Sequence, residues 1–393
     1  MTPAARVQAA IEILDGVIEG AKSNGAPADR IIANWAKSNR YAGSKDRRAV
    51  RELVYAAIRA CGPVPKTGRV AMLRLAEVDP AIAPLFDGSN YGPPAIGSRE
   101  KAADGGIVPA WLGERFAASG LGEEEQSALL DRAPLDIRIN TLKASSETID
   151  LPVAAEPLPI AQALRLPSGT QVEQWPAYRE GQIEVQDLGS QIACLAAEVK
   201  PGQTVIDLCA GAGGKTLGLA AAMENSGTLI ASDTDRGRLS KLPPRAERAG
   251  AGMIETVLLD AGKELDALAQ YRRMADCVFV DAPCSGTGTL RRKPEAKWRI
   301  DSRALARYAG VQDKLLDIAS ELVKPGGRIV FVTCSLLEEE GADRIDAFLK
   351  RTPGWQADPA PLPAGQSRGQ GMRLTPFHDG TDGFFIARVA LPC

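Results

Sequence analysis

The decisive stretch of this sequence runs Val278-Phe-Val-Asp-Ala-Pro-Cys-Ser-Gly-Thr-Gly-Thr-Leu-Arg-Arg-Lys-Pro-Glu-Ala-Lys-Trp298. Its three leading apolar residues predict a short buried strand that ends at Asp281 and is stopped by Pro283. Cys284 follows at once in a loop that contains glycine. In open α/β sheets, ligands bind beyond the carboxyl ends of the strands. Asp281 and Cys284 are therefore candidate site residues.

A second stretch has the same form. The apolar run Arg328-Ile-Val-Phe-Val332 predicts a strand, and Thr333-Cys334-Ser335 follows it. Free cysteines are often small buried hydrophobic residues, and this reading stays open for each cysteine taken alone. Two cysteines that both follow buried strands favour a shared site.

From Pro201 onward, strand and helix patterns alternate. This alternation predicts a mostly parallel, doubly wound sheet, which is a Rossmann-like α/β fold. The predicted strands are 204–208, 228–232, 254–258, 277–280 and 328–332, with a last strand near 384–389.

The first part of the chain reads as helical. Apolar spacing after Thr2-Pro3 predicts the first helix of this region. A later helix, the third, is predicted to be capped by Ser44, and one of its faces is basic and carries Arg47 and Arg48. Alternation from Leu135 to Leu142 predicts a strand of a small α+β unit. We therefore predict three domains: a helical domain with linker at 1–110, a small α+β unit at 111–190, and a catalytic domain at 191–393.

Charge is uneven along a chain whose formal net charge is only −2. Lys and Arg outnumber Asp and Glu between Ala26 and Ala60, and again between Arg291 and Arg299. Such local excess suggests contact with a polyanion at chosen faces, although solvated helix faces give the same pattern.

Cysteine and histidine usage excludes several classes of protein. The chain has seven cysteines, none in a Cys-x-x-Cys pair, and His378 is its one histidine. Zinc sites, a disulfide scaffold and a Ser-His-Asp hydrolase are poor fits. We see neither a secretory signal nor an apolar run of membrane-spanning length. We expect a reduced, cytoplasmic protein without metal or membrane contact.

A glycine loop, Cys209-Ala-Gly-Ala-Gly-Gly-Lys215, follows the first strand of the alternating region. A dinucleotide fingerprint fails because Thr216 stands where its third glycine belongs. A phosphate loop is a near miss and the main rival, because Gly214-Lys215-Thr216 fits it but Cys209 stands in place of its first glycine. S-adenosylmethionine is the third candidate, with Asp233 after the second strand for the ribose and Asp260 after the third strand near the adenine. Acidic residues after several strands favour a nucleoside over a triphosphate as the ligand of this site.

The chain resembles the Nol/Nop/Sun family of RNA cytosine-5 methyltransferases, and within it the bacterial Sun/RsmB ribosomal RNA enzymes. The resemblance covers about residues 130 to 393. Its motifs are Arg138-Ile-Asn-Thr-Leu-Lys143, Val185-Gln-Asp187 with Ser190-Gln191, Asp207-Leu-Cys-Ala210 through Lys215, Asp281-Ala-Pro-Cys-Ser-Gly-Thr-Gly288, Thr333-Cys-Ser335 and Gly380-Thr-Asp-Gly-Phe-Phe385. The family loop commonly carries a proline where this chain has Ala212, so the loop here should be slightly looser.

The resemblance implies specific roles. Cys334 would be the nucleophile, Asp281 would hydrogen-bond the base at N3, and Cys284 would assist release. The implied cofactor is S-adenosylmethionine, bound by Cys209, Ala210, Gly211, Ala212, Gly213, Gly214, Lys215, Asp233, Asp260 and Asp281. The implied RNA contacts are Arg47, Arg48, Arg291, Arg292, Lys293 and Trp298.

The domain order resembles that of the Sun/RsmB group, with a NusB-like helical RNA-binding domain and an RRM-like small unit. It therefore implies small-subunit (16S) ribosomal RNA as the substrate, and transfer RNA is the main competitor. A nucleoside triphosphatase, a DNA cytosine methyltransferase and a non-catalytic RNA-binding assembly factor remain alternatives. We expect a monomer.

Overall fold

The computed structural model describes residues 1–393. The chain forms two compact units, Met1–Arg132 with Thr289–Asp301, and Ala133–Gly288 with Ser302–Cys393. Two features differ from the three-domain prediction: residues 111–132 belong with the helical unit, and so does the segment that follows the Cys284 loop. None of the helices combines the length and apolar character that crossing a membrane requires.

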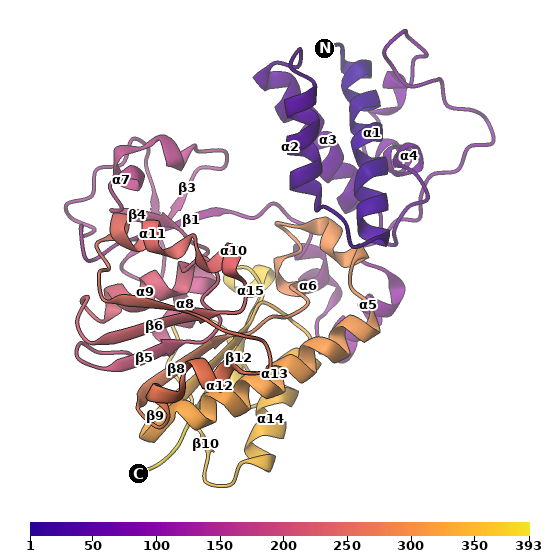
Figure 1. Cartoon of the computed structure of the whole chain (residues 1–393). Coiled ribbons are helices and arrows are strands. Elements are labelled where there is room, and N and C mark those ends of the chain that lie inside the picture. Colours follow the sequence, from indigo (N-terminus) through magenta and orange to yellow (C-terminus); the bar gives the residue numbers. More distant parts are fainter. The chain divides into compact units, whose positions relative to one another are not determined.

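The first unit is helical (Figure 1). Val7, Leu14 and Val17 recur at helical spacing in its first helix and are fully buried. The Thr2 side chain accepts a hydrogen bond from the Ala5 amide, as the sequence predicts for a cap. The third helix is capped by Gly43, so Ser44 is its first residue and not its cap. The helices are α1 Pro3–Lys22, α2 Ala28–Ser38, α3 Ser44–Ala60, α4 Gly68–Val78, α5 Ala110–Ala118 and α6 Glu123–Ala128, with 3-10 turns η1 Ala83–Leu85 and η5 Pro294–Trp298.

A small antiparallel sheet opens the second unit. Its strand order is β2-β3-β1-β4, and Ile137 and Ile183 are fully buried in its core. The strands are β1 Leu135–Ile139, β2 Glu156–Pro157, β3 Ala163–Leu166 and β4 Ile183–Val185, with turns η2 Val172–Gln174 and α7 Pro176–Arg179 between them.

A nine-stranded sheet forms the centre of the second unit, in the order β11-β12-β13-β9-β8-β5-β6-β7, with β10 paired to β13. The pairs of β5 with β6 and β8, of β6 with β7, and of β8 with β9 are parallel, as predicted. The strands are β5 Thr204–Asp207, β6 Thr228–Asp233, β7 Ile254–Leu258, β8 Ala275–Asp281, β9 Val323–Thr333, β10 Gln356–Ala357, β11 Gln366–Arg368, β12 Gly371–Leu374 and β13 Phe384–Ala390.

Helices cover both faces of this sheet (Figure 1). Neighbouring strand residues point to opposite faces, so Val205 packs with α8, α9 and α11, whereas Ile206 packs with α13 and α14. The helices are α8 Leu188–Leu195, α9 Gly214–Ala222, α10 Arg236–Leu239, α11 Leu242–Ala249, α12 Glu264–Ala267, α13 Ser302–Leu322, α14 Ala342–Arg351 and α15 Pro376–Asp379, with turns η3 Ala269–Tyr271, η4 Thr287–Thr289 and η6 Glu338–Glu340.

The order of the parallel strands reverses at β5, which lies between β6 and β8. This is the topological switch point at which open α/β sheets bind ligands. The glycine loop follows β5 and the Asp281 loop follows β8, so the fold brings both predicted motifs to this edge.

The predicted last strand, β13, runs antiparallel to β9, with Phe385 opposite Thr333. This pairing places Gly383 beside the Cys284 loop, where its amide donates to the Gly288 carbonyl at 2.8 Å. The short strands β10, β11 and β12 were not predicted, because each has too few residues for a periodic pattern.

Candidate active site

Two adjacent strands bring the two cysteine loops together. β8 and β9 are parallel, with Asp281 opposite Val332, so Cys284 and Cys334 follow the same edge of the sheet. Their Sγ atoms lie 3.4 Å apart. The Gly288 amide also donates to the Cys334 carbonyl at 2.9 Å, which joins the two loops through the backbone.

The two thiols are electrostatically unequal. The hydrogen bond from Cys284 lowers the pKa of Cys334 below its ordinary value, and this outweighs the effect of burial. The same hydrogen bond, together with burial, raises the pKa of Cys284. Cys334 is therefore the thiol of the pair that ionises first, and Cys284 donates to it once it has ionised.

Glu340 lies beneath the two loops and was not among the predicted site residues. It is fully buried, and its Oε1 accepts from the Ser285 amide at 2.8 Å while Oε2 accepts from the Ser285 hydroxyl. The Thr333 hydroxyl donates to the Glu340 carbonyl at 3.1 Å. Burial raises the pKa of the Glu340 carboxyl. Glu340 therefore ties the residue after Cys284 to the residue before Cys334.

Gln312 supports this arrangement from helix α13. It is fully buried, and its Nε2 donates to the Pro283 carbonyl at 2.9 Å and to Glu340 at 3.4 Å. In the sequence, Glu340 ends an acidic run and Gln312 lies in an amphipathic helix. Both patterns are typical of solvated residues, so no local signal predicted the burial of these two side chains.

The glycine loop after β5 forms a tight turn. The Gly213 amide donates to the Ala210 carbonyl at 2.9 Å, and Gly211 and Gly213 have left-handed φ values of 55° and 85°. Side chains rarely adopt this conformation, so glycine is required at both positions. A Cβ added at Gly214 would meet no atom within 4 Å, so open space borders the loop there.

Lys215 links the glycine loop to the Asp281 loop. Its Nζ lies 2.6 Å from Asp281 Oδ2. Burial lowers the pKa of Lys215, but the attraction and hydrogen bond of Asp281 outweigh it, so the pKa is raised. Lys215 is therefore charged and neutralises the carboxylate at the end of β8. Cys209 lies in the same loop, and burial raises the pKa of its thiol.

The acids after the second and third strands differ in exposure. Asp233 is buried, and it accepts the Gly211 amide at 2.8 Å through Oδ2 and the Asp235 amide at 2.7 Å through Oδ1. Asp260 is exposed after β7. Asp233 thus holds the glycine loop, a contact that the sequence did not reveal.

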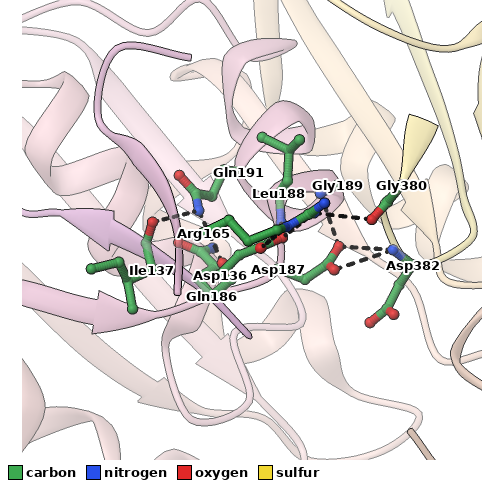
Figure 2. Close-up of polar contacts among 10 residues, drawn as sticks. All are labelled: Asp136, Ile137, Arg165, Gln186, Asp187, Leu188, Gly189, Gln191, Gly380 and Asp382. Atoms are coloured by element: carbon green, nitrogen blue, oxygen red, sulfur yellow. Dashed lines mark hydrogen bonds and ion pairs between the residues drawn. The ribbon is translucent and has the colours of Figure 1, made fainter. Parts of the chain in front are cut away.

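A polar cluster joins the small sheet, helix α8 and the loop before β13 (Figure 2). Arg165 pairs with Asp136 at 2.7 Å and donates to the Gly380 carbonyl at 3.1 Å. Asp187 accepts from the amides of Gly189 at 2.8 Å and Asp382 at 3.1 Å. The cluster fixes residues 380–382, and Gly383 next to them contacts the Cys284 loop.

The structure corrects part of the expected RNA contacts. Trp298 is only 9% exposed, and its indole nitrogen donates to the Gly62 carbonyl at 3.1 Å within the core of the helical unit. Arg291 is also buried, with 4% exposure. Neither side chain is placed to stack on RNA or reach phosphate, because long-range packing buries them. Arg47, Arg48, Arg292 and Lys293 are exposed.

Comparisons with known proteins show which family the chain resembles. The family described as 16S rRNA methyltransferase RsmB/F matches residues 194–390. The chain is 32% identical over 296 residues to the probable ribosomal RNA small subunit methyltransferase B of Synechocystis sp., covering 72% of this chain and 66% of that protein. It is 34% identical over 292 residues to the ribosomal RNA small subunit methyltransferase B of Xylella fastidiosa, covering 72% and 68%. The chain thus spans about two thirds of the length of these relatives.

One solved structure resembles the whole chain. The crystal structure of PH0851 superposes with a TM-score of 0.79 and 24% sequence identity, covering 99% of both chains. At this level of identity the likeness supports the fold alone.

Proposed function

Because the chain belongs to the RsmB/F family of 16S rRNA methyltransferases, we propose that it transfers a methyl group from S-adenosylmethionine to carbon 5 of a cytosine in RNA. The observation that carries this proposal is the pair of thiols 3.4 Å apart at the edge of the sheet that also holds the Asp281–Lys215 pair. The lowered pKa of Cys334 favours formation of the nucleophilic thiolate at this thiol rather than at Cys284.

The residues at the switch point fit S-adenosylmethionine. The Gly211 and Gly213 backbone turns closely and leaves open space at Gly214, which suits the amino-acid part of the cofactor. Asp233 uses its carboxylate oxygens to hold backbone amides, and carboxylate oxygens have further lone pairs for ribose hydroxyls. Exposed Asp260 is available toward the adenine.

The proposed chemistry assigns a role to each side chain. When bound, the cofactor supplies an electrophilic methyl group. Cys334 adds as a thiolate to carbon 6 of the cytosine, which makes carbon 5 nucleophilic enough to take that methyl. The electrons displaced by this addition reach N3, which takes up a proton from water, and the Asp281 carboxylate accepts a hydrogen bond from that N3–H and so supports the adduct. The carbon-5 proton then leaves to water with the assistance of Cys284, and the electron pair of that C–H bond expels the Cys334 thiolate, which restores the ring once N3 has also lost its proton.

The proposed substrate is a cytosine of small-subunit ribosomal RNA. The relatives named above are ribosomal RNA small subunit methyltransferases. The base must be unpaired or unstacked to reach the thiol. We propose that the helical unit is a NusB-like RNA-binding domain whose exposed Arg47 and Arg48 contact phosphate. A transfer RNA substrate is the alternative.

Transfer of labelled methyl to small-subunit ribosomal RNA, offered beside bulk transfer RNA, tests the proposal. We expect one 5-methylcytosine in ribosomal RNA by bisulfite mapping, and no label with C334A. We expect C284A to accumulate a covalent protein–RNA adduct on a denaturing gel, because release is impaired.

Each other outcome has a defined meaning. Normal turnover by C334A would remove Cys334 as the nucleophile. Label in transfer RNA alone would keep the chemistry and change the substrate. No label, together with no binding of S-adenosylmethionine, would favour a non-catalytic assembly factor.

A further inference from the structure

Helices α10 and α11 pack directly on the glycine loop. Arg238 comes from α10, and Leu242 and Arg245 come from α11. A Cβ added at Gly211 would lie 2.4 Å from Arg238, and one added at Gly213 would lie 2.1 Å from Leu242. The two helices therefore cover the side of the glycine loop where a side chain at Gly211 or Gly213 would clash with them.

Arg245 connects the loop to the small sheet. Its Nη1 donates to the Ala212 carbonyl at 2.6 Å, and its Nη2 donates to Glu184 Oε2 in β4 at 2.8 Å. Glu184 is 3% exposed and also pairs with Arg248. A buried carboxylate holds its cations firmly because water does not compete for them. One guanidinium nitrogen of Arg245 is thus held by Glu184, while the other donates to the glycine loop.

The loop needs such support. Ala212 lies between two left-handed glycines, and glycine loses the most conformational entropy when it is ordered. A second contact comes from the same part of the small sheet, since Gln186 donates to the Gly214 carbonyl at 3.3 Å. Glu184 and Gln186 are two residues apart in extended chain, so they point to the same side.

We propose that Arg245 is a positioning residue for the glycine loop, which it braces at the Ala212 carbonyl in the conformation that binds the cofactor. The inference rests on the proposed use of S-adenosylmethionine. A loop ordered before binding loses less entropy on binding, so the brace raises cofactor affinity without touching the reacting atoms.

Arg248 provides a matched control. It pairs with the same Glu184 carboxylate, donates to the Tyr178 carbonyl at 2.7 Å and lies over the Tyr178 ring. Its contacts do not include the glycine loop. The variants R245M and R248M each keep most of the apolar stem and remove one guanidinium from Glu184. Both should lower the melting temperature to a similar degree.

The test combines two measurements on the full chain. Calorimetry gives the dissociation constant for S-adenosylmethionine, and hydrogen exchange of a peptide spanning residues 209–215 reports loop order without cofactor. We expect R245M to bind about tenfold more weakly, as for loss of one charge-assisted hydrogen bond, and to exchange faster in this peptide. R248M should match the wild type in both.

Equal weakening by R245M and R248M would overturn the proposal, because the effect would then come from Glu184 alone. Unchanged loop exchange in R245M would overturn it as well. Absence of cofactor binding by the wild type would instead refute the proposed function, and the exchange comparison would still test the brace.

Discussion

At the scale of single residues, a hydrogen bond between two thiols makes their acidities unequal. The hydrogen bond between Cys284 and Cys334 lowers the pKa of Cys334 and raises that of Cys284. Glu340 holds the loops at this spacing through Ser285 and Thr333. Their shared hydrogen bond is thus the largest cause of the difference in pKa between Cys334 and Cys284.

The first prediction concerns the reactivity of Cys334 toward iodoacetamide. Because the thiolate is the reactive form, the alkylation rate should rise through a midpoint below pH 9 in the wild type. C284A removes the hydrogen-bond donor, so the pKa of Cys334 should rise and the midpoint should move to higher pH. Mass spectrometry of the Cys334 peptide measures the rate at each pH.

C284S serves as the control, because a hydroxyl donates in the same position and should keep the midpoint near that of the wild type. An equal midpoint in C284A and the wild type would contradict the assigned direction of the hydrogen bond.

At the scale of elements, one carboxylate joins helix α8 to the final loop, which is the loop of residues 380–383 before β13. Asp187 caps α8 through the Gly189 amide and also holds the Asp382 amide (Figure 2). Because Gly383 then donates to the Gly288 carbonyl, an aspartate in the first part of the unit helps to place the loop behind the cysteines.

The second prediction is that D187A destabilises the second unit by about 1–2 kcal/mol, as for loss of a helix cap. The amides of residues 382–383 should also exchange faster. Urea unfolding and hydrogen exchange of the 376–384 peptide measure the two effects.

D187N keeps one carbonyl acceptor and should lose less stability. Unchanged exchange at residues 382–383 in D187A would show that the final loop is held by its other contacts.

At the scale of the whole molecule, the chain leaves the second unit after Gly288, belongs to the helical unit for residues 289–301, and returns to the second unit at Ser302. Lys297 is fully buried in that unit, with its Nζ 2.9 Å from the Ile107 carbonyl. Burial lowers the pKa of Lys297 to about 7 from an ordinary value of 10.5. The folded helical unit therefore disfavours the charged lysine.

The third prediction follows from this titration. Between pH 7 and 10.5 the unfolded chain binds more protons at Lys297 than the folded chain, so this group makes the free energy of unfolding rise with pH. Below pH 7 the lysine is charged in both states, so burying its charge lowers the free energy of unfolding by the largest amount. K297M should therefore gain stability over the wild type at pH 7, and lose about 2 kcal/mol of that gain by pH 9.

Thermal and urea unfolding of the full chain at both pH values, with hydrogen exchange to localise the change, measures the difference. A gain that does not depend on pH would contradict a native pKa near 7. The conservative variant K297R keeps the charge and should show no gain at either pH.

Much of the fold was readable from local signals. Apolar runs that end in Asp207, Asp233 and Asp281 predicted β5, β6 and β8 to within a few residues, and their alternation with helices predicted the parallel sheet. The family was recognisable from Asp281-Ala-Pro-Cys and Thr333-Cys-Ser, which the comparisons confirm. Most of these features depend on residues close together in the chain.

What the sequence by itself determined is the order of strands and helices and the positions of Cys284, Cys334 and Asp281 at strand ends. Only the tertiary structure decided which core each segment joins. Trp298 lies in the core of the helical unit. Glu340 and Glu184 are buried and accept hydrogen bonds from residues that are 55 and 61 positions away in the sequence, respectively. A charged side chain can be buried only if a partner stabilises it, and here the partner is distant in the sequence. A local sequence pattern therefore does not predict which charged residues are buried.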